Sequence, residues 1–233
     1  MKKIGLVGGI SWTSTLDYYK YINEGVNQKL GGLESVECIL YSLNFADIQR
    51  KGWTNSFDLI YDACKSLVSS GVDAIALCAN TAHLFADEIQ SRINVPIIHI
   101  VSSTANAIKK DKLRTVGLLG TKFTMEMDFY RQKLEENNIA VLIPEGKTAI
   151  DTIQHIVKEE LGKGIVTEKS KKQFMQFSEQ LIERGAEGII LGCTEIPMLI
   201  GKDDFTVPVF DTTKIHVRSI LAFILDTEKP TAG

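Results

Sequence analysis

The chain has 233 residues, of which 44% are hydrophobic and 24% are charged, and its formal net charge is −3. This composition is typical of a soluble globular protein with a sizeable buried core. We expect no nucleic-acid partner, because Lys and Arg form neither an excess nor a run. We expect no membrane contact either, because no stretch of about 18 apolar residues is present and a weakly acidic surface gains little from anionic lipid.

The first apolar stretch, Ile4 to Val7, follows two lysines and ends at Gly8 and Gly9. It is too short for the core of a secretion signal, so we predict a first β-strand and a cytoplasmic location. The four cysteines should then be free thiols in a reducing compartment. None belongs to a C-x-x-C pair or lies near a histidine at metal-ligand spacing, so no metal is expected.

Short apolar runs alternate with amphipathic stretches along the chain. The runs, predicted as strands, cover 4–7, 37–43, 74–78, 97–100, 116–119, 140–143, 189–191 and 207–210. The predicted helices cover 14–29, 56–70, 81–92, 125–137, 149–162, 168–184 and 212–225. Strands that alternate with helices predict βαβ units, and continuous apolar strands are typical of a buried parallel sheet. The sequence therefore predicts an α/β fold.

The chain also repeats itself once, at a nearly constant offset. The matching pairs are IGLVGG (4–9) with VGLLGT (116–121), VPIIHI (95–100) with VPVFDT (207–212), and SGVDAIALCANTAH (70–83) with RGAEGIILGCTEIP (184–197). We predict two pseudo-symmetric halves, each a mainly parallel sheet flanked by helices, with the active site between them. The expected halves are 1–101, with the helix 212–225 packing back onto it, and 102–211.

Four loops follow the ends of predicted strands, with the sequences GGISWTST, ANTAH, GTKFT and GCTE. Loops at the carboxyl ends of parallel strands meet at one edge, and these are rich in small hydrogen-bonding residues that suit a small polar ligand. Alternatively, they are ordinary turns that cap the next helix. GLVGGIS is no dinucleotide fingerprint and no Walker sequence occurs, so a nucleotide cofactor is not expected.

The repeat aligns Ala79 with Cys193, Asn80 with Thr194, and Thr81 with Glu195. Cys193 ends a predicted strand where a helix should begin, and the backbone N–H groups there favour an anion. We therefore expect Cys193 to have a lowered pKa and to act as a base or nucleophile. The alternative is a buried thiol without a chemical role.

Taken together and in this order, GGISWTST, NTAH, GT-x-x-T and GCTE resemble the aspartate/glutamate racemase family over nearly the whole chain. The resemblance implies a homodimeric, cofactor-independent amino-acid racemase. Two acid/base residues, one on each face of the substrate α-carbon, would remove and return a proton, which suits groups that titrate near the working pH. Cys193 matches one of these two positions.

The sequence departs from the family pattern at the other position, where Ala79 replaces cysteine. Cys78 lies one residue too early, and in a continued strand its side chain points to the opposite face. His83, one helical turn further on, is expected to orient or pack rather than to be the missing acid. The proton could instead come from water or a hydroxyl, with Ser11, Ser14 and Thr81 as candidates. Besides a racemase, this leaves a single-cysteine lyase or isomerase of a small carboxylic acid, or an inactive amino-acid-binding protein.

The resemblance also implies which residues bind the substrate. Those expected at the α-carboxylate are Asn80, Thr81, Thr121, Thr124 and Thr194, with Ser11 nearby. Glu195 would bind the ammonium or tune the thiol, or is alternatively a surface carboxylate at the start of a helix. A distal carboxylate would meet Gln49, Arg50 or Lys163, each of which is alternatively a solvated surface residue. Trp12 and Trp53 would line the pocket or only pack.

Overall fold

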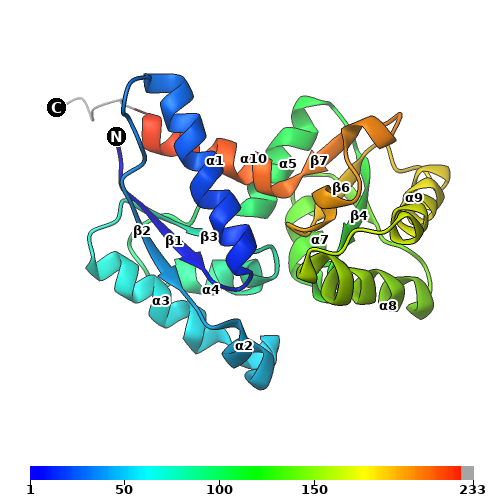
Figure 1. The fold of residues 1–233 in the computed structure, drawn as a ribbon, viewed down its shortest axis with the longest axis horizontal. Helices are drawn as coiled ribbons and strands as arrows, with labels where there is room; N and C mark the ends of the chain where they lie inside the picture. The colour runs from blue at the N-terminus through cyan, green and yellow to red at the C-terminus, as the bar shows by residue number, and fades with distance from the viewer. Residues whose placement is uncertain (227–233) are drawn as a thin grey trace. The chain divides into compact units, whose positions relative to one another are not determined.

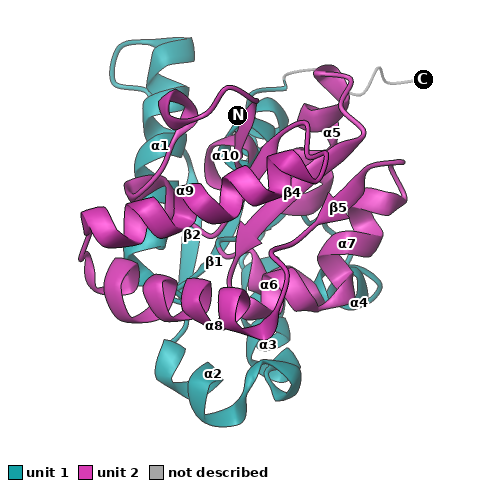
Figure 2. Cartoon of the chain, turned by 90° about the vertical axis from the view of Figure 1, so that its right-hand side faces the viewer, with its two compact units in different colours: residues 1–78, 85–99, 216–233 teal, residues 79–84, 100–215 magenta. Residues whose placement is uncertain are grey.

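The computed structural model describes residues 1–226 of the chain (Figure 1). The chain divides into two compact units, shown in different colours in Figure 2. Unit 1 contains residues 1–78, 85–99 and the described residues from 216 onward, and unit 2 contains 79–84 and 100–215. Within residues 1–226, no helix has both the length and the apolar character needed to cross a membrane.

Unit 1 is built on a parallel three-stranded sheet with the order β2-β1-β3. Its strands are β1 (Ile4–Gly8), β2 (Cys38–Ser42) and β3 (Ala74–Leu77). Its helices are α1 (Trp12–Leu30), α2 (Phe45–Lys51), α3 (Phe57–Ser69), α4 (Ala86–Gln90) and most of α10 (Thr212–Leu225), with a 3₁₀ turn at Trp53–Asn55.

The two faces of the unit 1 sheet are covered by different helices. Ile4 and Leu6 pack against α1 and α10, which lie side by side (Figure 1). Gly5, between them in sequence, faces Leu67 of α3 instead, as the alternation of side chains along a strand requires. The sheet is therefore buried on both faces, which accounts for the continuous apolar run of β1.

A buried hydrogen-bond chain holds α10 against α1. The Tyr18 hydroxyl lies 2.8 Å from Nδ1 of His216, and Nε2 of His216 lies 2.6 Å from the carbonyl oxygen of Ile98. Because a carbonyl only accepts, Nε2 carries the proton, and in the neutral ring Nδ1 accepts from Tyr18. Three segments far apart in sequence are joined in this way.

Unit 2 repeats the same plan with one more strand, in the order β5-β4-β6-β7, all parallel. Its strands are β4 (Thr115–Gly120), β5 (Ala140–Leu142), β6 (Ile189–Gly192) and β7 (Val209–Asp211). Its α-helices are α5 (Ile100–Lys110), α6 (Lys122–Glu126), α7 (Asp128–Glu135), α8 (Lys147–His155) and α9 (Glu168–Glu183). Shorter helical turns lie at Thr81–Phe85, Ile156–Glu160, Leu161–Lys163, Ile196–Met198 and Lys202–Asp204.

The internal repeat of the sequence is visible in these two topologies. In unit 1 a single parallel bridge, Ile75↔Ile97, joins Ile97 to β3, and in unit 2 the corresponding pair Ile189↔Val209 joins β6 to β7. The predicted fold class, two mainly parallel sheets flanked by helices, is confirmed. The run 97–100 contributes only a bridge, because α5 begins at Ile100.

Several predicted helices lie where they were expected, but each is divided into two or more shorter helical segments. The expected helix 81–92 is a 3₁₀ turn followed by α4, and the expected helix 125–137 is replaced by α6 and α7, which meet at Met127. The expected helix 149–162 becomes α8, a π-helix and a 3₁₀ turn. The helices α2 and α5 were not predicted.

The glycine pair at the end of β1 is a steric requirement. Gly9 has φ +80°, and a Cβ added there would overlap the backbone of Leu43. We therefore expect Gly9→Ala to destabilise unit 1. The matched control is Gly31→Ala, because Gly31 has nearly the same φ, +78°, but an added Cβ meets no described heavy atom within 4 Å.

In denaturant titrations, Gly9→Ala should lower the free energy of unfolding by about 1–3 kcal/mol more than Gly31→Ala, the usual cost of forcing atoms into filled space. Equal losses in the two variants would mean that only the backbone conformation, and not the contact with Leu43, requires glycine at this position.

Candidate active site

The register of β4 and β6 brings two of the predicted residues next to each other. Gly120 pairs with Gly192, and these are the last residues of their strands. Thr121 and Cys193 follow them directly, on neighbouring strands that run about 4.8 Å apart. Both glycines face Thr124: a Cβ added at Gly120 would lie 3.1 Å from the Thr124 Cβ, and one at Gly192 would lie 3.3 Å from its Cγ2.

Three threonine hydroxyls meet at this edge. The Oγ1 of Thr121 lies 3.0 Å from that of Thr124, and the Oγ1 of Thr81 lies 3.3 Å from the first and 3.4 Å from the second. Thr121 is also the N-cap of α6, where its Oγ1 accepts the backbone N–H of Thr124. A cluster of neutral hydroxyls, each able to rotate its proton outward, can donate several hydrogen bonds to a carboxylate.

Asn80 is held by a chain of hydrogen bonds that fixes the orientation of its amide. Thr212 Oγ1 donates to the carbonyl oxygen of Leu191 (2.8 Å), so its lone pairs accept the amide N–H of Asn80 (3.0 Å). The other amide atom, Oδ1 of Asn80, is buried and has no hydrogen-bond partner among the described residues. Asn80 therefore presents a buried acceptor, which suits an ammonium rather than a carboxylate.

Cys193 faces a carboxylate. Its Sγ donates to Oε2 of Glu195 at 2.9 Å, and the Thr194 hydroxyl donates to the same oxygen at 2.6 Å. Burial raises the pKa of the Cys193 thiol well above its ordinary value, and the negative charge of Glu195 raises it further. Cys193 is therefore a protonated thiol in the resting protein.

This corrects the expected lowering of the Cys193 pKa. The backbone N–H groups of Thr194 and Glu195 do lower the pKa, as expected, but burial and the carboxylate outweigh them. The helix that follows is only the 3₁₀ turn Ile196–Met198, so no long helix dipole points at the thiol.

Neither ionisable residue near Ala79 in sequence supplies the missing acid. Cys78 lies in the core of unit 1, 1% exposed, and burial raises the pKa of its thiol. His83 is 2% exposed; its Nε2 accepts the backbone N–H of Ile100 at 3.2 Å, so Nδ1 carries the proton donated to the Ala79 carbonyl at 3.0 Å. His83 thus orients the backbone at Ala79.

The remaining predicted residues lie in other settings. Ser11, in unit 1, is the N-cap of α1 and accepts the backbone N–H of Ser14 at 3.3 Å. Gln49 is exposed on α2, and Arg50 pairs with Asp47. Lys163, in unit 2, is exposed and pairs with Glu159 at 2.7 Å.

The two tryptophans differ in exposure. Trp12 is 68% exposed, whereas Trp53 is 8% exposed and packs near Phe45. Among residues 1–226, no group of three or more His, Cys, Asp or Glu side chains could hold a metal ion.

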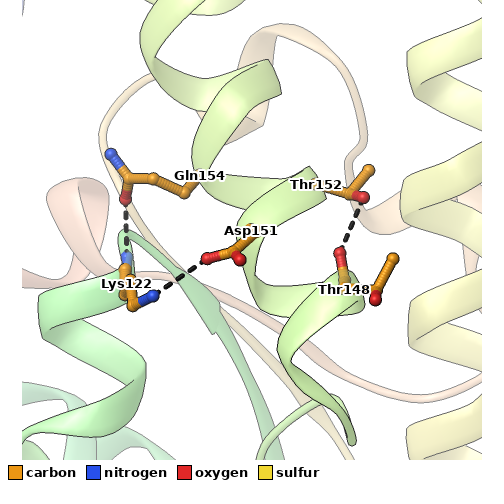
Figure 3. Close-up of polar contacts among 5 residues, drawn as sticks. All are labelled: Lys122, Thr148, Asp151, Thr152 and Gln154. Carbon is orange, nitrogen blue, oxygen red and sulfur yellow. Dashed lines mark hydrogen bonds and ion pairs between the residues drawn. The ribbon is translucent and has the colours of Figure 1, made fainter.

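Two contributing residues were missed at the sequence level. Thr212 orients Asn80, and its position directly after the repeated VPVFD segment was the available signal. Lys122 follows Thr121 and joins α6 to α8: its backbone N–H donates to Gln154 Oε1 (2.7 Å) and its Nζ to Asp151 Oδ1 (2.9 Å), as Figure 3 shows. No sequence motif indicated that Lys122 would contact Asp151 and Gln154.

Comparison with known proteins places the chain in a family. The sequence model described as Asp/Glu/Hydantoin racemase matches residues 7–220. A solved structure of a candidate Asp/Glu racemase from Yersinia pestis is 42% identical, with a TM-score of 0.90 over 97% of this chain and 100% of that one. An aspartate racemase homologue from Pyrococcus horikoshii OT3 is 38% identical, with a TM-score of 0.85 over the same shares.

Curated relatives are more distant. The broad specificity amino-acid racemase RacX of Bacillus subtilis (strain 168) is 28% identical over 173 residues, 71% of each chain. The glutamate racemase of Aquifex pyrophilus is 30% identical over 165 residues, which are 69% of this chain and 62% of that protein. The chain thus spans less than two thirds of that glutamate racemase.

The contact between Cys193 and Glu195 makes a prediction about thiol reactivity. Replacing Glu195 by Gln removes the negative charge that disfavours the thiolate, so the pKa of Cys193 should fall and the thiolate fraction at a given pH should rise. We expect Cys193 in Glu195→Gln to react with iodoacetamide several-fold faster near neutral pH, measured on its peptide by mass spectrometry.

In the unsubstituted protein the same reaction should accelerate as the pH is raised, because the thiolate forms only above the raised pKa. Glu183→Gln is the matched control, since Glu183 is exposed in the same unit and lies outside the site. An unchanged or slower reaction of Cys193 in Glu195→Gln would contradict the electrostatic role of Glu195.

Proposed function

The chain belongs to the Asp/Glu/Hydantoin racemase family, and from this premise we propose that it is an amino-acid racemase in which Cys193 carries protons to and from the substrate α-carbon. The observation that carries the proposal is the Cys193 thiol held against Glu195, beside the strand end that leads into the threonine cluster. No cofactor is part of the proposal.

The cluster and Asn80 would hold the two charged groups of an amino acid. The hydroxyls of Thr81, Thr121 and Thr124 would donate to the α-carboxylate, and Oδ1 of Asn80 would accept from the ammonium. This differs from the role implied by the family resemblance, in which Asn80 contacts the carboxylate. The hydrogen bonds that orient the Asn80 amide leave its oxygen as the group facing a ligand, and this supports a contact with the ammonium instead.

The protonated state of Cys193 determines its step. As a thiol it would give its proton to the carbanion at the α-carbon, and the negative charge would pass from carbon to sulfur. In the opposite direction the thiolate would take the α-proton and become a thiol again. Glu195, whose Oε2 accepts a hydrogen bond from the Cys193 thiol, would fix the orientation of this proton.

For the substrate we propose aspartate, glutamate or a related amino acid. A broad specificity amino-acid racemase and a glutamate racemase are among the relatives of this chain, and this supports the proposal. The two acidic amino acids differ by one methylene, which a pocket discriminates by only about 1–3 kcal/mol. Candidates for the distal carboxylate are Gln49, Arg50 and Lys163. Lys163 would have to exchange its ion pair with Glu159 for this role.

Ala79 favours a second candidate function. With no ionisable side chain there, a single-cysteine lyase or isomerase of a small carboxylic acid would exchange a proton on one face only. An inactive amino-acid-binding protein would exchange none.

Ser11, Thr194 and a water molecule complete the proposed polar contacts of the racemase. The proposed form of the protein is a cytoplasmic homodimer.

The deciding experiment follows α-proton exchange and optical rotation together. The protein is incubated in D₂O with each enantiomer of aspartate and glutamate, and exchange is followed by NMR. For at least one amino acid we expect α-proton exchange together with a loss of optical rotation. In Cys193→Ser we expect neither exchange nor any change in optical rotation. Cys38→Ser is the matched control, since Cys38 is a half-buried thiol in β2 and should leave the rate unchanged.

The other outcomes separate the alternatives. Exchange without loss of rotation contradicts a racemase and supports chemistry on one face. Binding without any exchange contradicts both enzymes and supports the binding protein. Exchange that survives in Cys193→Ser contradicts the role given to Cys193.

A further inference from the structure

A second polar groove lies in unit 2, between α8, the π-helix that follows it and the first turns of α9. It has a volume of about 450 Å³, within the usual range of small-molecule sites. Its polar lining includes Thr148, Asp151, His155, Glu160, Lys169 and Gln173. None of these residues belongs to the candidate active site.

Two opposite charges line this groove without pairing. Lys169 is exposed, and its ammonium forms no ion pair or hydrogen bond with any residue in 1–226. Glu160 is half-buried, and its Oε2 accepts the hydroxyls of Ser170 and Thr167, so the carboxylate is fixed in position. Its Oε1 has no hydrogen-bond donor within the described part of the chain.

The turn that carries Glu160 is unusual. Residues Ile156–Glu160 form a π-helix, a wide turn that is rare and often found at functional sites. Ile156 and Val157 of this turn are buried in the core of unit 2, which anchors the turn while Glu160 faces the groove. The position of the carboxylate is thus set by packing.

On the opposite wall, α8 contributes Asp151, which is ion-paired, and the His155 ring. Asp151 pairs with Lys122 at 2.9 Å, and this hydrogen bond lowers the pKa of the Asp151 carboxyl (Figure 3). The Thr152 hydroxyl donates to the Thr148 carbonyl, so it is turned along the helix (Figure 3). Of the lysines and carboxylates that line the groove, Lys169 and Glu160 are therefore the two without an ion pair among residues 1–226, and the Gln173 amide and the His155 ring line it beside them.

We propose that this groove is a second binding site, for a small zwitterion such as a free α-amino acid. The ligand carboxylate binds Lys169 and Gln173, and its ammonium binds Oε1 of Glu160. A dianion or a dication would leave one lining charge opposed by a like charge, whereas a zwitterion satisfies both. The site is distinct from Cys193 and does not depend on the function proposed for it.

The groove is also tied to the candidate active site. Lys122 pairs with Asp151 through Nζ and with Gln154 through its backbone N–H, and it directly follows Thr121 in the chain (Figure 3). Asp151, which lines the groove, is thus ion-paired with the residue that follows the N-cap of α6.

The test is an NMR titration of the full ¹⁵N-labelled chain with glycine, the smallest zwitterion. Acetate and methylammonium serve as probes that carry only one of the two charges. We expect saturable shifts of amides in α8, the π-helix and the start of α9, in the unsubstituted chain and equally in Cys193→Ser. Lys169→Gln should weaken this binding by at least about tenfold, as expected for a charge-assisted hydrogen bond.

Lys172→Gln is the matched control, because Lys172 is an exposed lysine of α9 that does not line the groove. It should bind glycine as the unsubstituted chain does. The proposal is overturned if these amides show no saturable shift, if the two lysine variants bind equally, or if acetate alone binds as tightly as glycine. Shifts that vanish in Cys193→Ser would also overturn it, since they would report the other site.

Discussion

The hydrogen bonds of the short segment 79–84 hold the candidate site together. This segment leaves β3 of unit 1 and belongs to unit 2, because Asn80 donates to Thr212 and Thr81 meets the hydroxyls of Thr121 and Thr124. Thr212 in turn donates to Leu191 on β6, two residues before Cys193. The segment therefore aligns polar groups at the carboxyl ends of two parallel strands, where ligands bind in folds of this class.

Burial governs the chemistry of the site more than any single charge. Cys193 is 8% exposed, so its thiolate would lose solvation, and Glu195 adds a like charge beside it. A thiol kept protonated in this way is prepared to donate a proton and becomes a base only after it has done so. Glu195 is then best understood as the residue that orients the S–H bond. This follows from the geometry, in which one carboxylate oxygen receives both the thiol and the Thr194 hydroxyl.

The fold class could be predicted from the sequence, because buried parallel strands are continuous apolar runs and the internal repeat showed the same pattern twice. The sequence also placed Asn80, Thr81, Thr121 and Cys193 after strands, and of these the structure joins Thr81 to Thr121 by a hydrogen bond. It did not predict the direction of the Cys193 pKa, which depends on burial and on a carboxylate two residues away.

Contacts between distant segments carried no sequence signal. The ion pair of Lys122 with Asp151 joins α6 to α8, and the π-helix is anchored by Ile156 and Val157 in the core of unit 2; no local pattern predicted either. Lys163, predicted to meet a distal carboxylate or to be a solvated surface residue, is exposed and pairs with Glu159 four residues earlier, a local contact that the sequence analysis did not consider.

Ala79 sets the limit on what this site can do. Its neighbours in sequence are committed elsewhere: Cys78 is packed in the core of unit 1, and both ring nitrogens of His83 are bonded to backbone groups. A proton delivered on that face must come from a hydroxyl or from water, which are much weaker acids than a thiol. Proton exchange on the Cys193 face should therefore be faster than on the other, and inversion of the α-carbon should be limited by the face that lacks a thiol.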